Sequence, residues 1–281
     1  MTEATESNRE QGAGNKRKAG RDRRSLLSVM RSRAYLYELI RRTNVADAGE
    51  LKRAVLSEDG DSASALSLAV TWNPRFDRVI NGNLTVTELL LKQVSQKKRL
   101  ASARLVHEIG PEEDQGNVPL WAIFEDRVEE FEEIIESGLR LSPASDLGVG
   151  RVDRVALLFL PADQWHELRT SSDVAAGPNL AQRAYDAGYF TADLRRLATA
   201  IAFWMLCLKG ADEWGPMETL LDWLMTGPYT RVIAQLGISE EMRDLLRMIA
   251  EDHHIQQGNV AAAARALTRF GTDGKRADPF G

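Results

Sequence analysis

The feature that most constrains the fold is a series of apolar stretches whose hydrophobic residues recur at helical spacing between helix start and stop signals. In the second half of the chain, one stretch covers residues 193–208 and another covers residues 214–225. Pro216 stands near the start of the second stretch, and Gly227 and Pro228 follow its end. Proline is favoured in the first turn of a helix and glycine just past the last turn. These stretches predict a mainly helical chain.

Two further helices are predicted closer to the C-terminal end. Ser239 is a favourable N-cap residue, and Glu240 and Glu241 follow it, where acidic side chains suit the positive end of the helix dipole. Asn259 is expected to cap an alanine-rich helix that ends at Gly271. The second half of the chain therefore has the pattern of an α-helical domain.

The first half of the chain is also predicted to be helical. A first helix is expected to begin at the N-cap residue Ser25, and a shorter helix covers residues 46–56. Thr85 and Glu88 have the spacing of a capping box, in which each side chain binds a backbone N–H group of the first turn. A third helix is therefore expected to run from these residues to the stop signal at Gly110.

Strands play a minor part in this pattern. Residues 155–160 form the one run that is convincing as a buried strand, and residues 66–70 fit either a strand or a helix turn. One or two short strands among eight or more helices do not make an α/β domain. The predicted fold class is all-α (mostly): an irregular helical bundle of one or two lobes, with at most one or two short strands.

Shifts in composition divide the chain into four parts. Residues 1–24 offer almost no apolar side chain to bury and are predicted to be a disordered basic arm. A stretch rich in Gly, Ser and Asp separates an N-terminal helical lobe, residues 25–141, from a C-terminal helical lobe, residues 151–271. Residues 272–281 are expected to form a flexible tail.

Composition excludes several classes of protein. With 43% hydrophobic residues the chain can bury a sizeable core, and its single cysteine excludes a disulfide framework. The first 25 residues lack the apolar segment of a secretory signal, and the longest apolar run, residues 197–208, is shorter than the about 20 residues of a membrane span. We expect a soluble, intracellular protein without a membrane partner, and nuclear import through the basic arm if the host is eukaryotic.

The formal net charge of −5 hides an uneven distribution. Residues 15–33 carry a net charge of +7, so the rest of the chain carries −12. A basic arm on an acidic body indicates an acidic partner such as nucleic acid, an anionic membrane or an acidic protein surface, although a tail that only maintains solubility explains the same charges. The candidate phosphate ligands of this stretch are Lys16, Arg17, Lys18, Arg21, Arg23, Arg24, Arg31 and Arg33.

A second basic stretch covers residues 92–104, which contain five cations and no acid. On one continuous helix, residues seven apart lie on the same side, so these cations would form a broad basic surface that could hold phosphates. An ordinary solvated helix face is the alternative. Aromatic side chains are missing from the stretch, which argues against base stacking. The candidate ligands of this stretch are Lys97, Lys98, Arg99 and Arg104.

The charge changes sign immediately afterwards, because residues 112–136 carry a net charge of −9. The basic and acidic stretches could pair within one molecule. They could equally pair head to tail between copies, and a contact of that kind produces rings or filaments. The sequence leaves both arrangements open, and the second predicts a homo-oligomer.

Two short segments resemble known families. Residues 118–138 open with Val118-Pro119-Leu120 and close with Gly138, and they resemble one ankyrin repeat, which implies protein–protein binding. An array needs at least about three repeats, and we find no second good copy. Residues 258–267 are similar to the opening helix of Fis-type helix-turn-helix domains, but the chain ends before a recognition helix could follow.

The sequence offers little support for catalysis or for a cofactor. The adjacent pair His253 and His254 is poorly placed for joint metal ligation, and Glu251 with His254 lacks a further ligand. Asp163 and His166 fit a polar corner as well as a catalytic pair. No phosphate-binding loop, dinucleotide fingerprint or nucleophile elbow is present, and Cys207 has the surroundings of a core residue.

Three classes of function remain. The first is a non-enzymatic α-helical assembly protein that self-associates and contacts nucleic acid, RNA without sequence specificity, through its basic arm, in a coat- or nucleocapsid-like role. The second is an adaptor or scaffold that binds proteins and uses the arm as a localisation signal. The third is an enzyme with no recognisable motif. The acidic body counts against the first class, since proteins that coat nucleic acid are usually basic overall.

Overall fold

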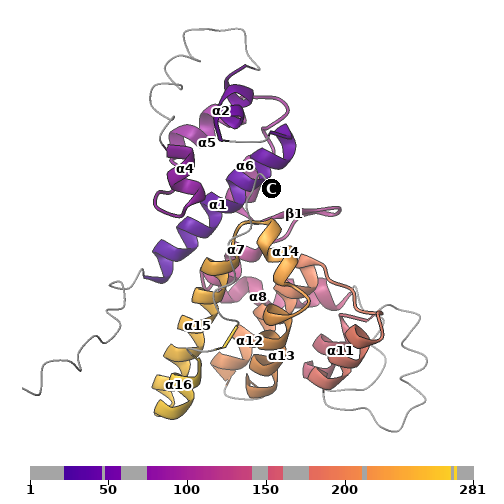
Figure 1. Cartoon of the computed structure of the whole chain (residues 1–281). Helices are drawn as coiled ribbons and strands as arrows, with labels where there is room; N and C mark the ends of the chain where they lie inside the picture. The colour runs from indigo at the N-terminus through magenta and orange to yellow at the C-terminus, as the bar shows by residue number, and fades with distance from the viewer. Residues whose placement is uncertain are drawn as a thin grey trace, which may run out of the picture.

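The computed structural model describes residues 22–45, 48–57, 75–140, 151–160, 177–210, 214–266 and 269–270 of the chain. In these ranges the protein is built almost entirely from helices, which confirms the predicted fold class (Figure 1). The helices are α1 (Arg23–Thr43), α2 (Ala48–Ser57), α4 (Arg75–Ile80), α5 (Glu88–Ser95), α6 (Ala103–Glu108), α7 (Leu120–Phe124), α8 (Val128–Leu139), α9 (Arg151–Leu157), α11 (Gly177–Asp186), α12 (Leu194–Gly210), α13 (Trp214–Thr226), α14 (Thr230–Gln235), α15 (Ser239–Gln256) and α16 (Val260–Ala266).

The sheet of the described residues is a single two-stranded hairpin. Strand β1 (Glu112–Glu113) pairs antiparallel with β2 (Gly116–Asn117), and Glu113 faces Gly116 in the register. The turn before the hairpin is stabilised by Asn117, whose side-chain amide donates a 2.8 Å hydrogen bond to the carbonyl oxygen of Gly110. This hairpin lies at the entry to α7.

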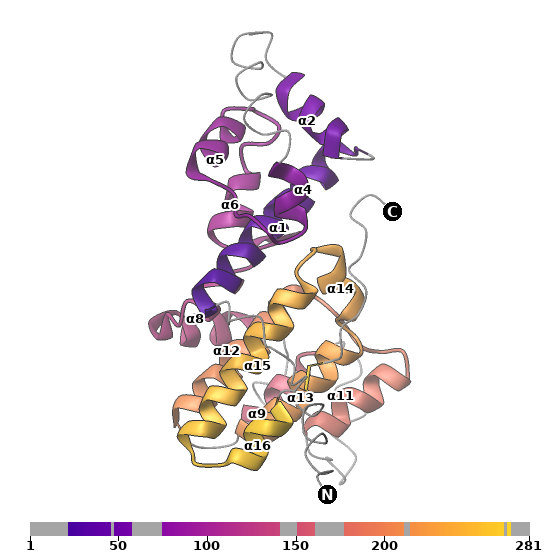
Figure 2. The same cartoon turned by 60° about the vertical axis from the view of Figure 1, so that its left-hand side comes forward.

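Two hydrophobic clusters organise the packing. The smaller cluster joins the second half of α1 to α2, α4, α5 and the start of α6, and we call this part the small lobe. The larger cluster joins the first half of α1 to the helices from α7 onward, and we call this part the large lobe. Figures 1 and 2 show the small lobe at the top and α1 running from one lobe into the other. Because α1 contributes to both clusters, its two halves hold the lobes together.

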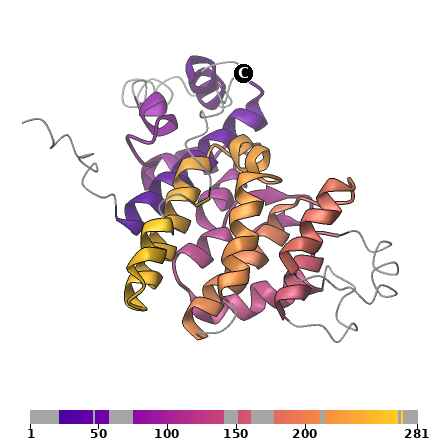
Figure 3. The same ribbon diagram turned by 60° about the horizontal axis from the view of Figure 1, so that its bottom comes forward.

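The lobe boundary predicted at residues 142–150 lies outside the described residues, and the predicted division of the chain remains a prediction. On either side of that stretch, α8 and α12 pack against each other within the large lobe. They approach closely at Gly138, where an added Cβ would lie 1.8 Å from the hydroxyl oxygen of Thr199. The C-terminal helix α16 packs against α15 in the same lobe, and the yellow colour marks this end of the chain in Figure 3.

The first helix begins earlier than expected. Its N-cap is Asp22, whose carboxylate accepts a 2.7 Å hydrogen bond from the N–H group of Ser25, so the prediction that Ser25 caps the helix was wrong. At the other end Asn44 adopts a left-handed conformation with φ of 51°, and its N–H group donates to the carbonyl oxygen of Ile40. Aspartate is common at the N-cap because its side chain accepts a first-turn N–H group, and asparagine is common at the C-terminal end because it tolerates the left-handed conformation.

The predicted continuous helix up to residue 109 is also wrong. Thr87 rather than Thr85 caps α5, and α5 ends at Ser95. A series of tight turns follows, in which the N–H group of Leu100 donates to the carbonyl oxygen of Lys97, and α6 begins only at Ala103. The break folds α6 against α5 and brings Leu100 into the small-lobe cluster, which a single straight helix would not do.

Residues 155–160 do not form the predicted strand. They complete α9 and the turn that follows it, and all six side chains are buried in the large-lobe region. A short run that is apolar on every side fits a buried helix as well as a buried strand, so periodicity cannot separate the two. The alternative strand at residues 66–70 lies outside the described residues. The helices predicted at residues 46–56, 193–208 and 214–225 are confirmed within one or two residues.

Candidate nucleic-acid interface

The basic arm meets the folded body at the start of α1. Lys16, Arg17, Lys18 and Arg21 lie outside the described residues. Arg24 is exposed on the first turn of α1. Arg23 is half-buried there, and this burial lowers the pKa of its guanidinium, while the carboxylates of Asp126 and Asp252 act in the opposite direction. The chain therefore enters α1 beside the loop between α7 and α8.

The two remaining arginines of the first basic stretch are engaged inside the molecule. Arg31 forms an ion pair with Glu125, in the middle of the acidic stretch. The Arg33 side chain is only 2% exposed, and its Nη1 atom donates to both carboxylate oxygens of Glu241, at 2.8 and 2.9 Å. A guanidinium buried in this way has no surface on which to meet a phosphate, so Arg24 is the exposed cation of this stretch among the described residues.

The second basic stretch is not a single helix face, because it crosses the break between α5 and α6. Lys97 lies in that break and is buried, whereas Lys98 and Arg99 are exposed. Arg104 on α6 pairs with Glu88 at 2.8 Å and with Glu108 one turn later. The broad basic surface that the seven-residue spacing predicted is therefore broken up, and the exposed cations of the stretch are Lys92, Lys98 and Arg99.

Several carboxylates of the acidic stretch pair within the same molecule. Glu112 meets Arg42 and also Arg41, the latter at 3.7 Å, and Asp126 meets Lys209 at 2.9 Å. Glu113 accepts hydrogen bonds from the first N–H groups of α12, and burial still raises the pKa of its carboxyl group. These partners lie on α1 and α12, so the contacts described here join the acidic stretch to other helices than the predicted basic one.

A cluster that sequence reasoning missed lies where α1 meets α6. The ring of His107 packs edge-on against Tyr35, with ring centroids 6.1 Å apart, and Arg31 lies close enough to repel a proton on the imidazole. Burial is the main reason why the pKa of His107 falls from 6.5 to about 4. The hydroxyl of Tyr35 is buried as well, and its pKa is raised by burial.

This histidine predicts a pH dependence of stability. Since the folded state favours neutral imidazole, the contribution of His107 is complete above pH 6.5 and is lost as the pH falls towards 4. Allowing for partial exposure, we expect the free energy of unfolding to fall by about 2 kcal/mol more in the wild type than in His107→Phe between pH 7 and 4.5. Urea unfolding at both pH values measures this difference, and equal losses in the two proteins would contradict it.

The histidines considered for catalysis are part of a buried polar cluster. Nε2 of His254 lies 3.2 Å from the carboxylate of Glu218, which is fully buried and also pairs with Arg269. His253 and His254 both pack edge-on against Trp214. Burial, with the neighbouring His254 second, lowers the pKa of His253. The sequence signal for this cluster was the acid Glu218 within a mainly apolar helix, whose other acid is Asp222.

The contacts of this cluster hold α13 and α15 together. Within the described ranges no three His, Cys, Asp or Glu side chains gather as metal ligands. The metal pairing considered for Glu251 and His254 is therefore replaced by the contact of His254 with Glu218 from α13. Cys207 is buried, as its apolar surroundings indicated, and Asp163 and His166 lie outside the described residues.

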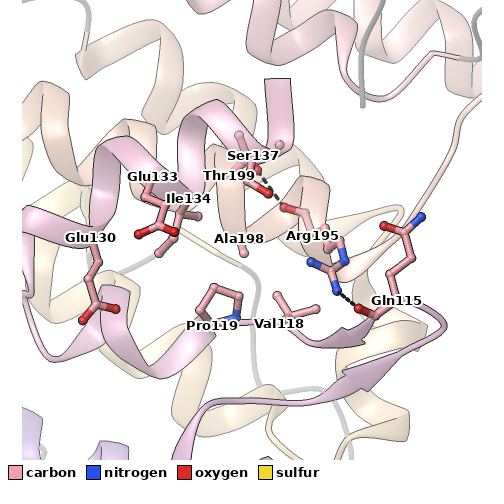
Figure 4. A pocket seen from close by; sticks show the side chains of 11 residues that line it. Gln115, Val118, Pro119, Glu130, Glu133, Ile134, Ser137, Arg195, Ala198 and Thr199 are labelled. Atoms are coloured by element: carbon pink, nitrogen blue, oxygen red, sulfur yellow. Dashed lines mark hydrogen bonds between the residues drawn. The ribbon is translucent and has the colours of Figure 1, made fainter. Parts of the chain in front are cut away.

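A groove lies between α8 and α12 (Figure 4). It has a volume of about 240 Å³, an apolar floor and carboxylates at one end. Its lining residues are Gln115, Val118, Pro119, Glu130, Glu133, Ile134, Ser137, Gly138, Arg195, Ala198 and Thr199.

Comparison with models of protein families, with curated proteins and with solved structures finds no match to this chain. None of the described helices is both long and apolar enough to cross a membrane.

Proposed function

We propose that this protein is a non-enzymatic helical assembly protein that contacts nucleic acid through its basic N-terminal arm, in a coat- or nucleocapsid-like role. The observation that carries the proposal is the contrast between the arm and the body. In the folded body, Arg31, Arg33 and Arg104 are each engaged by a carboxylate. In the arm, six cations fall within residues 16–24 against one acid, Asp22.

That contrast makes the arm the strongest candidate for phosphate contacts. Residues 16–18 are three consecutive cations, and Asp22 is engaged as the N-cap of α1. A short run of lysine and arginine binds phosphates through charge and carries no base-reading geometry, so binding without sequence preference follows. Single-stranded RNA is the expected ligand, and the exposed Lys98 and Arg99 would add a second contact. The same run would also act as an import signal in a eukaryotic host.

The arm predicts a measurable salt dependence. If Lys16, Arg17, Lys18 and Arg21 each neutralise one phosphate, the affinity for a single-stranded RNA should fall about 50-fold between 50 and 200 mM salt, from a slope of about 0.7 per contact. Replacing all four by glutamine should remove most of this slope and most of the affinity at 50 mM salt. Fluorescence anisotropy with a labelled homopolymer measures both quantities.

The matched control removes the same charge elsewhere. Arg53, Arg78, Arg183 and Arg231 are exposed on other helices, and their replacement by glutamine should leave the slope nearly unchanged. If the arm variant and this control variant bind RNA equally well, the arm is not the contact. If the wild type binds no RNA and instead forms a complex of fixed stoichiometry with a protein, the adaptor function replaces the present proposal.

Self-association is the second half of the proposal. It is supported by the separation of charge between the arm and the acidic stretch of residues 112–136, since opposite charges on one chain favour head-to-tail contacts between copies. Size-exclusion chromatography with light scattering, at low and high salt and with and without RNA, tests it. A monomer under all of these conditions would contradict the assembly role and leave nucleic-acid binding to be judged by the anisotropy experiment.

A further inference from the structure

The groove between α8 and α12 has two different ends. Val118, Pro119, Ile134 and Ala198 form an apolar floor, and Glu130 and Glu133 stand at one end (Figure 4). A cavity of about 240 Å³ with this lining suits a long side chain with an apolar stem and a charged head.

The opposite end of the groove carries Arg195, which backbone carbonyl groups hold through one nitrogen, while its Nε atom has no hydrogen-bond partner among the described residues. The Nη2 atom of Arg195 donates hydrogen bonds of 2.8 and 3.2 Å to the carbonyl oxygens of Gln115 and Gly116. The hydroxyl of Thr199 donates to the carbonyl oxygen of Arg195 one turn earlier on α12. Because Nη2 of this arginine is held by its own neighbours and Glu130 already pairs with Arg127, the group left to meet a ligand at the other end is the carboxylate of Glu133. A cationic head is therefore the match for the groove.

The carboxylates beside the groove continue along the exposed side of α8. Glu129, Glu133 and Glu136 are exposed and make no hydrogen bond or ion pair within the part of the chain that the structure describes. Their spacing of three or four residues places like charges next to one another on a helix, which is destabilising. The last turn of α8 carries no basic residue to offset the helix dipole. A cationic segment along this side would relieve both effects.

The position of α1 supplies such a segment. Arg31 of α1 pairs with Glu125, and Arg23 lies near Asp126, so the start of α1 is next to the start of α8 (Figure 2). Lys16 is six residues before Asp22 in the sequence, which is an extended reach of about 20 Å. A 12-residue helix such as α8 is about 18 Å long. The basic segment of residues 16–21 can therefore reach the groove of its own chain.

We propose that residues 16–21 dock in the α8–α12 groove of the same molecule, with one lysine or arginine stem over Pro119 and Ile134 and its charged head at the carboxylate of Glu133, next to the ion pair of Glu130 with Arg127. The docking itself depends only on this geometry and on the charges. Its consequence rests on the proposed function. An arm that is bound in the groove is not available to nucleic acid, so RNA must compete with the groove to bind the arm. The groove would then act as an internal competitor for the arm.

Crosslinking between two introduced cysteines tests the docking directly. In a Cys207→Ala background, Ala19→Cys in the arm is combined with Ser137→Cys, because Ser137 is exposed and lines the groove. The control partner is Arg53→Cys on α2, in the small lobe, because α1 of 21 residues separates this lobe from the arm by roughly 30 Å. With a short bismaleimide at 50 mM salt, we expect the crosslink at Ser137 to form at least tenfold faster, and to slow at 500 mM salt.

Charge variants make the experiment specific. Glu130→Gln with Glu133→Gln should slow the crosslink about fivefold, and Asp77→Asn with Asp186→Asn, which removes two exposed acids elsewhere, should not. Equal rates at Ser137 and the control position would overturn the proposal. A crosslink that joins two molecules, seen as a dimer in a denaturing gel, would also overturn it, because the occupant would then be the arm of a second copy.

RNA affinity separates this inference from the proposed function. Glu130→Gln with Glu133→Gln should raise RNA affinity at least threefold above that of Asp77→Asn with Asp186→Asn, because the arm is released. Equal affinities of these two variants would overturn the competition. If the full chain binds no RNA while the salt-sensitive crosslink forms, the proposed function fails and the docking is supported.

Discussion

Replacing Arg33 by alanine will lower the free energy of unfolding by about 3–5 kcal/mol, because it leaves the carboxylate of Glu241 buried without its partner. Both side chains are 2% exposed, and two hydrogen bonds of 2.8 and 2.9 Å join them across the contact between α1 and α15. A charge removed from water and left unpaired is far more costly than a lost surface ion pair. Urea unfolding followed by circular dichroism measures the change.

The double variant Arg33→Met with Glu241→Leu is the control for this prediction. It removes both charges and fills the space with apolar side chains, and we expect its stability to be close to or above that of the wild type. A loss of less than about 1 kcal/mol in the alanine variant would show that water reaches Glu241 on its own. Since α1 is shared by both lobes, the alanine variant should loosen the contact of α1 with the large lobe in hydrogen exchange.

The variant Gly110→Ala is expected to lose about 2–4 kcal/mol of stability, from overpacking together with backbone strain. Gly110 has φ of +150°, where side chains are rarely tolerated, and an added Cβ would lie 2.0 Å from the carbonyl oxygen of Val118 and 3.0 Å from the backbone nitrogen of Leu120. Backbone atoms cannot move aside as the end of a flexible side chain can. The hairpin and the entry to α7 would have to shift.

The variant Gly116→Ala, in the hairpin that follows Gly110, separates overpacking from backbone strain. The φ of Gly116 is +98°, but no atom lies within 4 Å of an added Cβ, so Gly116→Ala carries backbone strain without a clash and should cost only about 1 kcal/mol. Thermal and urea unfolding of both variants provide the comparison. Equal losses would mean that strain alone explains the effect at Gly110 and that the clash is relieved by movement of the hairpin.

The helices could be predicted where their signals are local. Asn259 caps α16 as expected, with its side-chain oxygen accepting from the N–H group of Ala262, and α13 ends beside Gly227. Local signals gave the wrong N-cap where two nearby residues could both cap the helix, as Asp22 and Ser25 could at the start of α1. They also failed at Leu100, where burial in the small lobe favours a break that the sequence spacing does not reveal.

The candidate site could be predicted only in part. The excess of positive charge in residues 16–24 is a property of composition and needs no structure. The groove could not be predicted, because its floor combines Pro119 before α7 with Ala198 on α12, far apart in the chain. The buried contact of Glu218 with His254 likewise joins two helices, and a search for ligand spacing along one helix could not find it.

By itself, the sequence determined that this chain is helical and that its cations are concentrated at the start, because helix periodicity, caps and charge runs are set by neighbouring residues. Only the tertiary structure decided which of those cations remain accessible. Arg24 and Arg33 are the same residue type and lie nine positions apart on one helix. Arg24 is nevertheless exposed, whereas Arg33 is buried in an ion pair with Glu241, 208 residues away in the chain. A charge can be buried only where the fold places a partner beside it, and that partner cannot be predicted from the neighbouring residues in the sequence.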